Sequence, residues 1–304
     1  MFYPTLAGSA DLLVSRTGYD IVSRYDGSTG EYLGDFIPAG YSGLDGPTGI
    51  TFGPDGNLYV ASTENDSILR YNAQTGAFID EFVTSGSGNM QSPQTILFGP
   101  DNNLYVVDAG IESVLRYNGQ TGDFMGAFIS GYNLDFPFGM TFGPNSDLYV
   151  THSGADSQVI RYNGLTGVFI DEFLGGGSGW VAGLDLPAAI VFGPDDNLYV
   201  ADRSHNTIKC YNGETGVFID DFVSSGSGGL LVPEGTICFS PDGYMYVTSH
   251  NSGDIIRYDG QTGEFIDQFI DCSQATFFVI TPEPNTLLLL GLGVPIILGL
   301  RKRR

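Results

Sequence analysis

A nine-residue segment returns at regular intervals along this chain, and this repetition restricts the possible fold more than any other feature. It reads FGPDGNLYV from Phe52, FGPDNNLYV from Phe98, FGPNSDLYV from Phe142, FGPDDNLYV from Phe192 and FSPDGYMYV from Phe239. A second segment, RYNAQTGAFIDEF in one copy, follows each of these, and its tyrosine occurs six times at spacings of 46, 46, 45, 49 and 47 residues. The chain therefore contains six units, of which five are complete.

Each unit is predicted to form four short antiparallel strands. In the unit that begins at Gly49, the apolar run 49–52 suits an inner strand, and a Pro-Asp-Gly turn leads to a second strand at 57–62. We expect the third strand at 67–71 and the fourth at 77–82, joined by a hairpin turn that contains an Asn-Gly pair in the next unit. Charge pairs such as Asp80-Glu81 suit an exposed edge strand, where they oppose pairing with another chain.

Four antiparallel strands repeated six times predict an all-β fold, a six-bladed β-propeller. The first unit lacks its inner strand, because DLLVS from Asp11 already matches the second strand NLYVA. The segment ATFFVITP from Ala275 resembles the missing inner strand. We therefore expect residues 275–281 to pair beside residues 11–15 and close the first blade, so that the propeller domain spans residues 1–281.

The repeat resembles the NHL-type propeller repeat, and most closely its Gly-Pro-Asp-Gly-rich versions in secreted bacterial proteins. The resemblance covers residues 11–281. It implies the propeller fold and leaves the function open, because one architecture hosts many activities.

Residues 282–304 form a separate tail. Pro282-Glu283-Pro284 precedes an uncharged run of 15 residues, 286–300, and the chain ends in four basic residues. The run is short for a membrane span of about 20 residues, although the residues before it bring it close. Each terminal base would cost about 2.5–3.5 kcal/mol at mid-bilayer, so these bases are expected in the cytoplasm and the propeller on the other side.

This tail resembles a PEP-CTERM sorting signal: the motif, a short transmembrane-type helix and a basic end. The resemblance implies an exosortase-type processing enzyme as partner, transient anchoring in the membrane, and release to the cell envelope or exterior. The alternative is an ordinary tail anchor. Residues 1–20 show no signal peptide, which an exported protein needs, so we expect that the start codon was assigned too far downstream or that the sequence is a fragment.

The charge excludes one class of partner. The net charge is −23, and the four terminal bases bring the preceding 300 residues to −27. So acidic a body repels phosphate backbones, and nucleic acid is not an expected partner. The three cysteines, Cys210, Cys238 and Cys272, lack CxxC spacing and suit buried thiols better than a disulfide or zinc site.

Ligands of propellers usually meet the mouth of the central channel, at the starts of the first strands and the ends of the second. The first-strand positions are Thr48, Gln94, Phe138, Ala188 and Glu234. The second-strand positions are Arg16, Ser62, Asp108, His152, Asp202 and Ser249.

Four of these residues could gather around a divalent cation that activates water: Asp108, His152, Asp202 and Glu234. Carboxylates with one imidazole suit calcium, magnesium or manganese. The alternative interpretation is a set of solvated loop residues. His205 and His250 are expected to be exposed, and Trp180 could stack on a sugar or pack against a blade.

Gluconolactonase-like hydrolases and streptogramin lyases are propellers with related repeats and a metal site. This sequence shows neither family's wider motifs, so no residue is assigned from them. Three functions remain open: a non-catalytic module that binds a polysaccharide or a protein, a metal-dependent lactonase or lyase, and a structural component of the envelope. The regularity of the repeats favours the first, because an active site usually breaks one or two of them.

Overall fold

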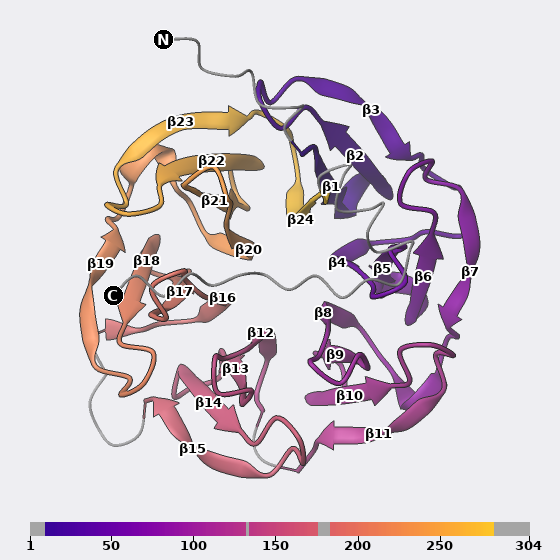
Figure 1. Ribbon diagram of the computed structural model, residues 1–304, viewed down its shortest axis with the longest axis horizontal. Helices are drawn as coiled ribbons and strands as arrows, with labels where there is room; N and C mark the ends of the chain where they lie inside the picture. Colours follow the sequence, from indigo (N-terminus) through magenta and orange to yellow (C-terminus); the bar gives the residue numbers. More distant parts are fainter. Residues whose placement is uncertain (1–9, 132–133, 176–182, 283–304) are drawn as a thin grey trace, which may run out of the picture.

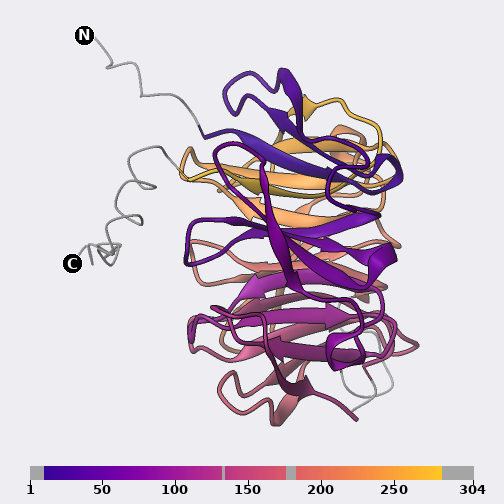
Figure 2. The same cartoon turned by 90° about the vertical axis from the view of Figure 1, so that its right-hand side faces the viewer.

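The computed structural model describes residues 10–131, 134–175 and 183–282, and these form a closed ring of six four-stranded antiparallel sheets (Figure 1). The predicted six-bladed propeller is confirmed. In a view turned by 90°, the strands run along the axis of the ring (Figure 2). The sorting residues Glu283 and Pro284, the rest of the tail and Trp180 lie outside the described residues.

Blades 2 to 6 are built in chain order from the axis outward, and blade 1 has the order β24-β1-β2-β3. The first strands are β24 (Ala275–Ile280), β4 (Pro47–Phe52), β8 (Pro93–Phe98), β12 (Pro137–Phe142), β16 (Pro187–Phe192) and β20 (Pro233–Phe239). The second strands are β1 (Leu12–Arg16), β5 (Leu58–Ser62), β9 (Leu104–Asp108), β13 (Leu148–His152), β17 (Leu198–Asp202) and β21 (Tyr244–Ser249). The third strands are β2 (Ile21–Tyr25), β6 (Ser67–Tyr71), β10 (Ser113–Tyr117), β14 (Gln158–Tyr162), β18 (Thr207–Tyr211) and β22 (Asp254–Asp259). The fourth strands are β3 (Tyr32–Ile37), β7 (Phe78–Val83), β11 (Phe124–Ile129), β15 (Phe169–Leu174), β19 (Phe218–Val223) and β23 (Phe265–Ile270). We number the blades 1 to 6 in this order.

The ring closes as the sequence predicts. β24 pairs antiparallel with β1, with Leu12 opposite Ile280 and Val14 opposite Phe278, and the amide of Thr281 donates to the carbonyl of Asp11 at 2.8 Å. Blade 1 therefore takes its inner strand from one end of the propeller segment and its other three strands from the opposite end. Closure of this kind leaves no unpaired inner edge.

Neighbouring blades are joined by aromatic rings. The fully buried Tyr59 of blade 2 meets Phe82 of its own blade and Phe98 of blade 3, each edge-to-face with ring centroids 4.9 Å apart. This is the geometry that buried aromatic rings prefer. The equivalent tyrosines of blades 3 to 6 repeat the contact: Tyr105, Tyr149, Tyr199 and Tyr246. The LYV motif thus forms the second strand of a blade and also packs that blade against the next one.

The turn between third and fourth strands differs from the expected one. In blade 3 the Asn-Gly pair does not form a two-residue turn. The amide of Asn118 donates to the carbonyl of Asp123, and the Asn118 side chain accepts from the amides of Gln120 and Thr121. The residue with positive φ is Gly122, at 74°. A Cβ on Gly122 would clash with the carbonyl oxygen of Phe82 in blade 2, so this glycine serves close packing between blades.

The charge pairs of the fourth strands also have partners within the blade. In blade 2, Arg70 of the third strand binds Asp80 through two hydrogen bonds of 3.0 and 2.5 Å. Blades 4 and 6 repeat this pair with Arg161–Asp171 and Arg257–Asp267. In blade 5 the arginine is replaced by Cys210, a buried free thiol.

Two faces of the ring follow from this order. We call the loop face the one at which the second strands end, at Ser62, Asp108, His152, Asp202 and Ser249, opposite the proline that begins each first strand. The segment that links one blade to the next, here called a connector, also lies on this face. The opposite, turn face carries the Pro-Asp-Gly-type turns.

Candidate functional site

The central channel is apolar. The six first strands enclose a cavity of about 160 Å³, and its lining contains glycine, threonine and apolar residues but no charged side chain. Near the loop face Phe138 of β12 stacks on Phe277 of β24, with ring centroids 5.8 Å apart and planes 11° apart. These strands belong to blades that face each other across the ring (Figure 1). The aromatic pair therefore crosses the channel beneath its mouth.

Asp108 holds a connector in place. Its carboxylate is fully buried and accepts hydrogen bonds from the amides of Gln91 at 2.6 Å, Gly110 at 3.0 Å and Ile111 at 3.2 Å. Burial raises the pKa of Asp108, and the three amides act in the opposite direction. The carboxylate is thus committed to the backbone of the loop face.

Asp202 does the same in blade 5. It accepts from the amide of Asp185 at 3.2 Å and from the amide of His205 at 3.0 Å, and Nδ1 of His205 lies 2.9 Å from it. Burial is the main cause that raises the pKa of Asp202, against the lowering effect of His205 and Lys209. His205 is exposed as expected, and so is His250.

Serine performs this task in two other blades. Ser62 Oγ accepts from the amide of Asp45 at 3.0 Å, and Ser249 Oγ accepts from the amide of Leu231 at 3.0 Å. Four of the five complete units therefore use the last residue of the second strand to hold the connector.

His152 is the exception. Its side chain is 5% exposed, and neither ring nitrogen has a hydrogen-bond partner among the described residues. The nearest charged group is the carboxylate of Asp135, 4.0 Å from Nε2. Burial lowers the pKa of His152 and outweighs the raising effect of Asp135 and Asp156, so the imidazole is neutral at pH 7. In blade 4 the residue at this position does not hold the connector.

The remaining predicted residues have structural partners. Glu234 forms an ion pair with Arg203 at 3.0 Å, and Arg16 donates to the carbonyl of Ser273 at 2.9 Å. Thr48 binds the carbonyl of Pro93 at 3.0 Å. Gln94 donates to the hydroxyl of Ser92 at 3.2 Å, and the carbonyl of Ala188 accepts from the hydroxyl of Thr151 at 3.0 Å.

The four candidate metal ligands are not brought together. Across residues 10–131, 134–175 and 183–282, no group of three or more His, Cys, Asp or Glu side chains is placed to hold a metal ion. Asp108 and Asp202 face their own connectors, His152 faces Asp135, and Glu234 faces Arg203. The physical reason is that each strand end serves its own blade boundary instead of the ring axis.

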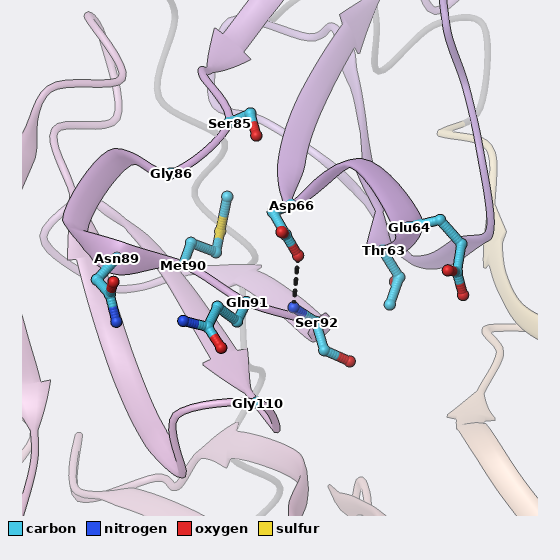
Figure 3. A pocket seen from close by; sticks show the side chains of 10 residues that line it. All are labelled: Thr63, Glu64, Asp66, Ser85, Gly86, Asn89, Met90, Gln91, Ser92 and Gly110. Atoms are coloured by element: carbon cyan, nitrogen blue, oxygen red, sulfur yellow. Dashed lines mark hydrogen bonds between the residues drawn. The ribbon is translucent and has the colours of Figure 1, made fainter.

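A wide depression on the loop face lies between blades 2 and 3 (Figure 3), with a volume of about 610 Å³. Glu64, Asp66 and Gln91 line it. Asp66 accepts from the amide of Ser92 at 2.8 Å, and Asp20 makes the same bond to Gly46 one blade earlier. The depression is therefore formed by a repeated joint between blades.

A second cavity, of about 300 Å³, lies in blade 4 beside His152. Three carboxylates line it, from Asp135 in the connector, Asp156 in the following loop and Glu172 in β15. Sequence reasoning missed these three residues. The signal that could have found them is local: blade 4 is the unit in which a histidine replaces the serine or aspartate that ends the second strand.

The comparisons with known proteins identify the tail. Residues 281–304 match the PEP-CTERM protein-sorting motif. The chain is thus a six-bladed propeller with a sorting motif that implies export. No curated protein sequence matches the chain. Among the described residues, no helix has the length and apolar character needed to cross a membrane.

Solved structures share the fold at low identity. A protein of unknown function from Bacteroides caccae is 14% identical over 90% of this chain and all of its own, with a TM-score of 0.67. A chain of a nidogen/laminin complex is 17% identical over 90% of this chain and 98% of its own, with a TM-score of 0.68. A catalytically inactive virginiamycin B lyase from Staphylococcus aureus, with quinupristin, is 19% identical over 81% of this chain and 78% of its own, with a TM-score of 0.56. These likenesses support the propeller, while the NHL type of the repeat stays a prediction.

Proposed function

We propose that this exported propeller is a non-catalytic binding module that holds a polysaccharide or a protein on its loop face. One observation carries the proposal: the side chains suited to catalysis at the strand ends are used to fix the loops. Asp108, Asp202, Ser62 and Ser249 bind connector amides. A surface fixed in this way loses little conformational entropy when it binds a ligand.

The fold neighbours agree with this function without deciding it. One neighbour comes from a nidogen/laminin complex and another is a lyase, so the architecture serves both binding and catalysis. The crossing of the channel by Phe138 and Phe277 favours binding on the surface over chemistry inside the channel.

The alternative function is a divalent-metal-dependent lactonase or lyase. It would require Asp108, His152, Asp202 and Glu234 to leave their present partners and converge on calcium, magnesium or manganese. Tight cation binding that is lost in both Asp202→Ala and Glu234→Ala would favour this alternative. A structural envelope component without any specific ligand is the third possibility.

We also infer how the tail is used. An exosortase-type enzyme recognises Pro282-Glu283-Pro284 while the apolar run holds the protein in the membrane, and the cleaved propeller is then found in the cell envelope or outside the cell. Mass spectrometry of the protein from the cell exterior tests this: we expect a species that lacks the apolar run. Recovery of the intact tail in that fraction would contradict the inference, as would unchanged processing of Glu283→Ala.

The binding function is tested with the full chain in mild detergent against an array of polysaccharides and a panel of acidic and basic proteins. A double variant of the loop face, Glu64→Ala with Asp156→Ala, is compared with a double variant of the turn face, Glu214→Ala with Glu264→Ala. All four residues are exposed, and both variants change the net charge equally. We expect saturable binding that only the loop-face variant weakens. Absence of binding to every probe would refute the function, and an equal effect of both variants would refute the assigned face.

A further inference from the structure

Blade 5 contains an internal counterpart of the cavity in blade 4. The strand registers match the two blades residue by residue: His152 corresponds to Asp202, Ile160 to Lys209 and Glu172 to Asp221. Phe169 and Phe218 begin the fourth strands of the two blades. The repeat thus places a fourth-strand carboxylate and an aromatic ring around one spot in both blades. Two positions differ in kind: His152 stands for Asp202, and Ile160 stands for Lys209.

In blade 5 this spot is filled by a lysine side chain. Lys209 is 5% exposed, and its Nζ lies 2.7 Å from Oδ1 of Asp221 and 3.9 Å from Oδ2 of Asp202. The same nitrogen lies 5.5 Å from the ring centroid of Phe218. A buried ammonium group requires such partners, because an unpaired buried charge is costly. Blade 5 therefore shows what this arrangement binds: an ammonium group on an alkyl stem.

In blade 4 the arrangement is present but the amine is missing. Ile160 stands where Lys209 stands in blade 5, and the cavity of about 300 Å³ opens beside it. Glu172 and Asp156 form no ion pair within the described part of the chain. The nearly buried His152 has no hydrogen-bond partner there either, although both of its ring nitrogens are polar.

Among the described residues, the other blades lack this combination. Blade 1 has Asp35 at the position of Glu172, but its carboxylate accepts from the hydroxyls of Ser23 and Tyr32. Glu81 of blade 2 occupies the position of Glu172, but its carboxylate accepts from the amide of Ser85 at 2.9 Å. Blade 3 has Ala127 at that position and blade 6 has Gln268. Blade 4 is thus the unit in which a fourth-strand carboxylate, two loop carboxylates and an unpartnered imidazole face one cavity.

The chemistry of this set suits an organic ammonium ion. An ammonium group carries three N–H donors, and the cavity offers carboxylate oxygens and a neutral imidazole as acceptors. Within the described part of the chain, no three His, Cys, Asp or Glu side chains are placed to hold one metal ion. The charge of −23 attracts basic proteins over longer distances.

We propose that the cavity of blade 4 binds a lysine side chain of a basic partner protein, in the way that blade 5 binds its own Lys209. The proposal rests on the binding function given above and names its ligand. Glu172 and Asp135 pair with the ammonium group, His152 accepts a hydrogen bond from it, and the alkyl stem lies along Ile160 and Phe169.

The test uses the three histidines of the chain as reporters. The full chain, labelled with ¹⁵N at the imidazole rings, is titrated in mild detergent with Nα-acetyl-lysine methylamide and, separately, with its Nε-acetylated form. We expect saturable shifts of the His152 resonances with the charged probe only, while His205 and His250 stay unchanged. Equal shifts with both probes, or none with either, would overturn the proposal.

Two variants and a matched control separate this site from general charge attraction. Ile160→Lys supplies the amine from within, as in blade 5, and is expected to abolish the response to the probe. Glu172→Gln is expected to weaken binding about ten-fold or more, as for loss of a charge-assisted hydrogen bond. The control Glu81→Gln makes the same change at the same position of blade 2 and should leave affinity unchanged. Unaltered affinity in Ile160→Lys would overturn the proposal even if the variant folds normally.

The same titration with a glucosamine oligomer separates the two kinds of amine. Tighter binding of this oligomer than of a lysine peptide of equal charge would overturn the assignment to a protein partner. If the array and protein panel show saturable loop-face binding that Ile160→Lys does not change, the proposed function stands and the lysine site fails. If no probe binds the loop face at all, both fail.

Discussion

The removal of the Asp108 carboxylate measures how strongly a strand end holds its connector. Asp108 accepts three amide hydrogen bonds, but the amide of Gly110 also donates to the carbonyl of Gln91 at 3.0 Å. Asp108→Ala therefore leaves two amides, those of Gln91 and Ile111, without a partner. A buried unsatisfied donor costs about 1–3 kcal/mol, but Gln91 is exposed and Ile111 is half-buried, so water replaces part of each bond. We therefore expect the variant to lose about 1–3 kcal/mol of unfolding free energy in all.

The repeat itself supplies the control. Ser62 holds its connector amide with one hydroxyl at 3.0 Å, so Asp108→Ser is expected to restore the bond to Gln91 and recover about half of the loss. Urea unfolding of the full chain, followed by tyrosine fluorescence and circular dichroism, gives both values if the two signals coincide. A loss below about 1 kcal/mol in Asp108→Ala, or a serine variant less stable than the alanine variant, would refute the reasoning.

Three further predictions follow from other contacts. Burial raises the pKa of Asp108, so the stability that its protonation contributes is full below its ordinary pKa of 3.8 and is lost as the pH rises through its folded-state pKa. Asp108→Ser should therefore cost less unfolding free energy at pH 7 than at about pH 3.5. Urea midpoints that show the reverse order would contradict this. Gly122→Ala should destabilise the protein by over about 1 kcal/mol more than Gly86→Ala, since both have a φ of 74° but only the first would meet Phe82, and equal melting temperatures would argue against packing as the cause. Phe278→Ala, in the closing strand and 3% exposed, should cost about 3–5 kcal/mol by calorimetry, and a change near zero would show that closure contributes little.

The strands and the ring closure could be predicted from the sequence because they depend on local, repeated signals. The motif LYV, which reads MYV in the last copy, predicts the second strand of each complete unit, and the match of Ala275 to a first strand predicts the closure. The turn at Asn118 was placed correctly but not its form, since Gly122 is required by Phe82 of the preceding blade. That requirement appears only when two blades lie side by side.

The candidate site was less predictable for the same reason. Asp108 and Asp202 were placed on the right face, yet their partners are backbone amides, which no side-chain pattern in the sequence marks. The stacking of Phe138 on Phe277 joins opposite blades and has no sequence signal. Lys209 could have been noticed as the basic residue at an otherwise mostly apolar third-strand position, and this comparison of repeats would have led to blade 4.

The pairing of β24 with β1 has a consequence for biosynthesis. The propeller cannot be completed during translation until the segment at 275–280 has left the ribosome, so the nascent chain exposes the edge of β1 for most of its synthesis. Because the sorting motif begins at residue 281, its proteolytic removal would leave every register pair between β24 and β1 in place and would cost at most the bond from Thr281 to Asp11. The strand that closes the ring is thus synthesised before the sorting tail, and the tail contributes no strand to the ring.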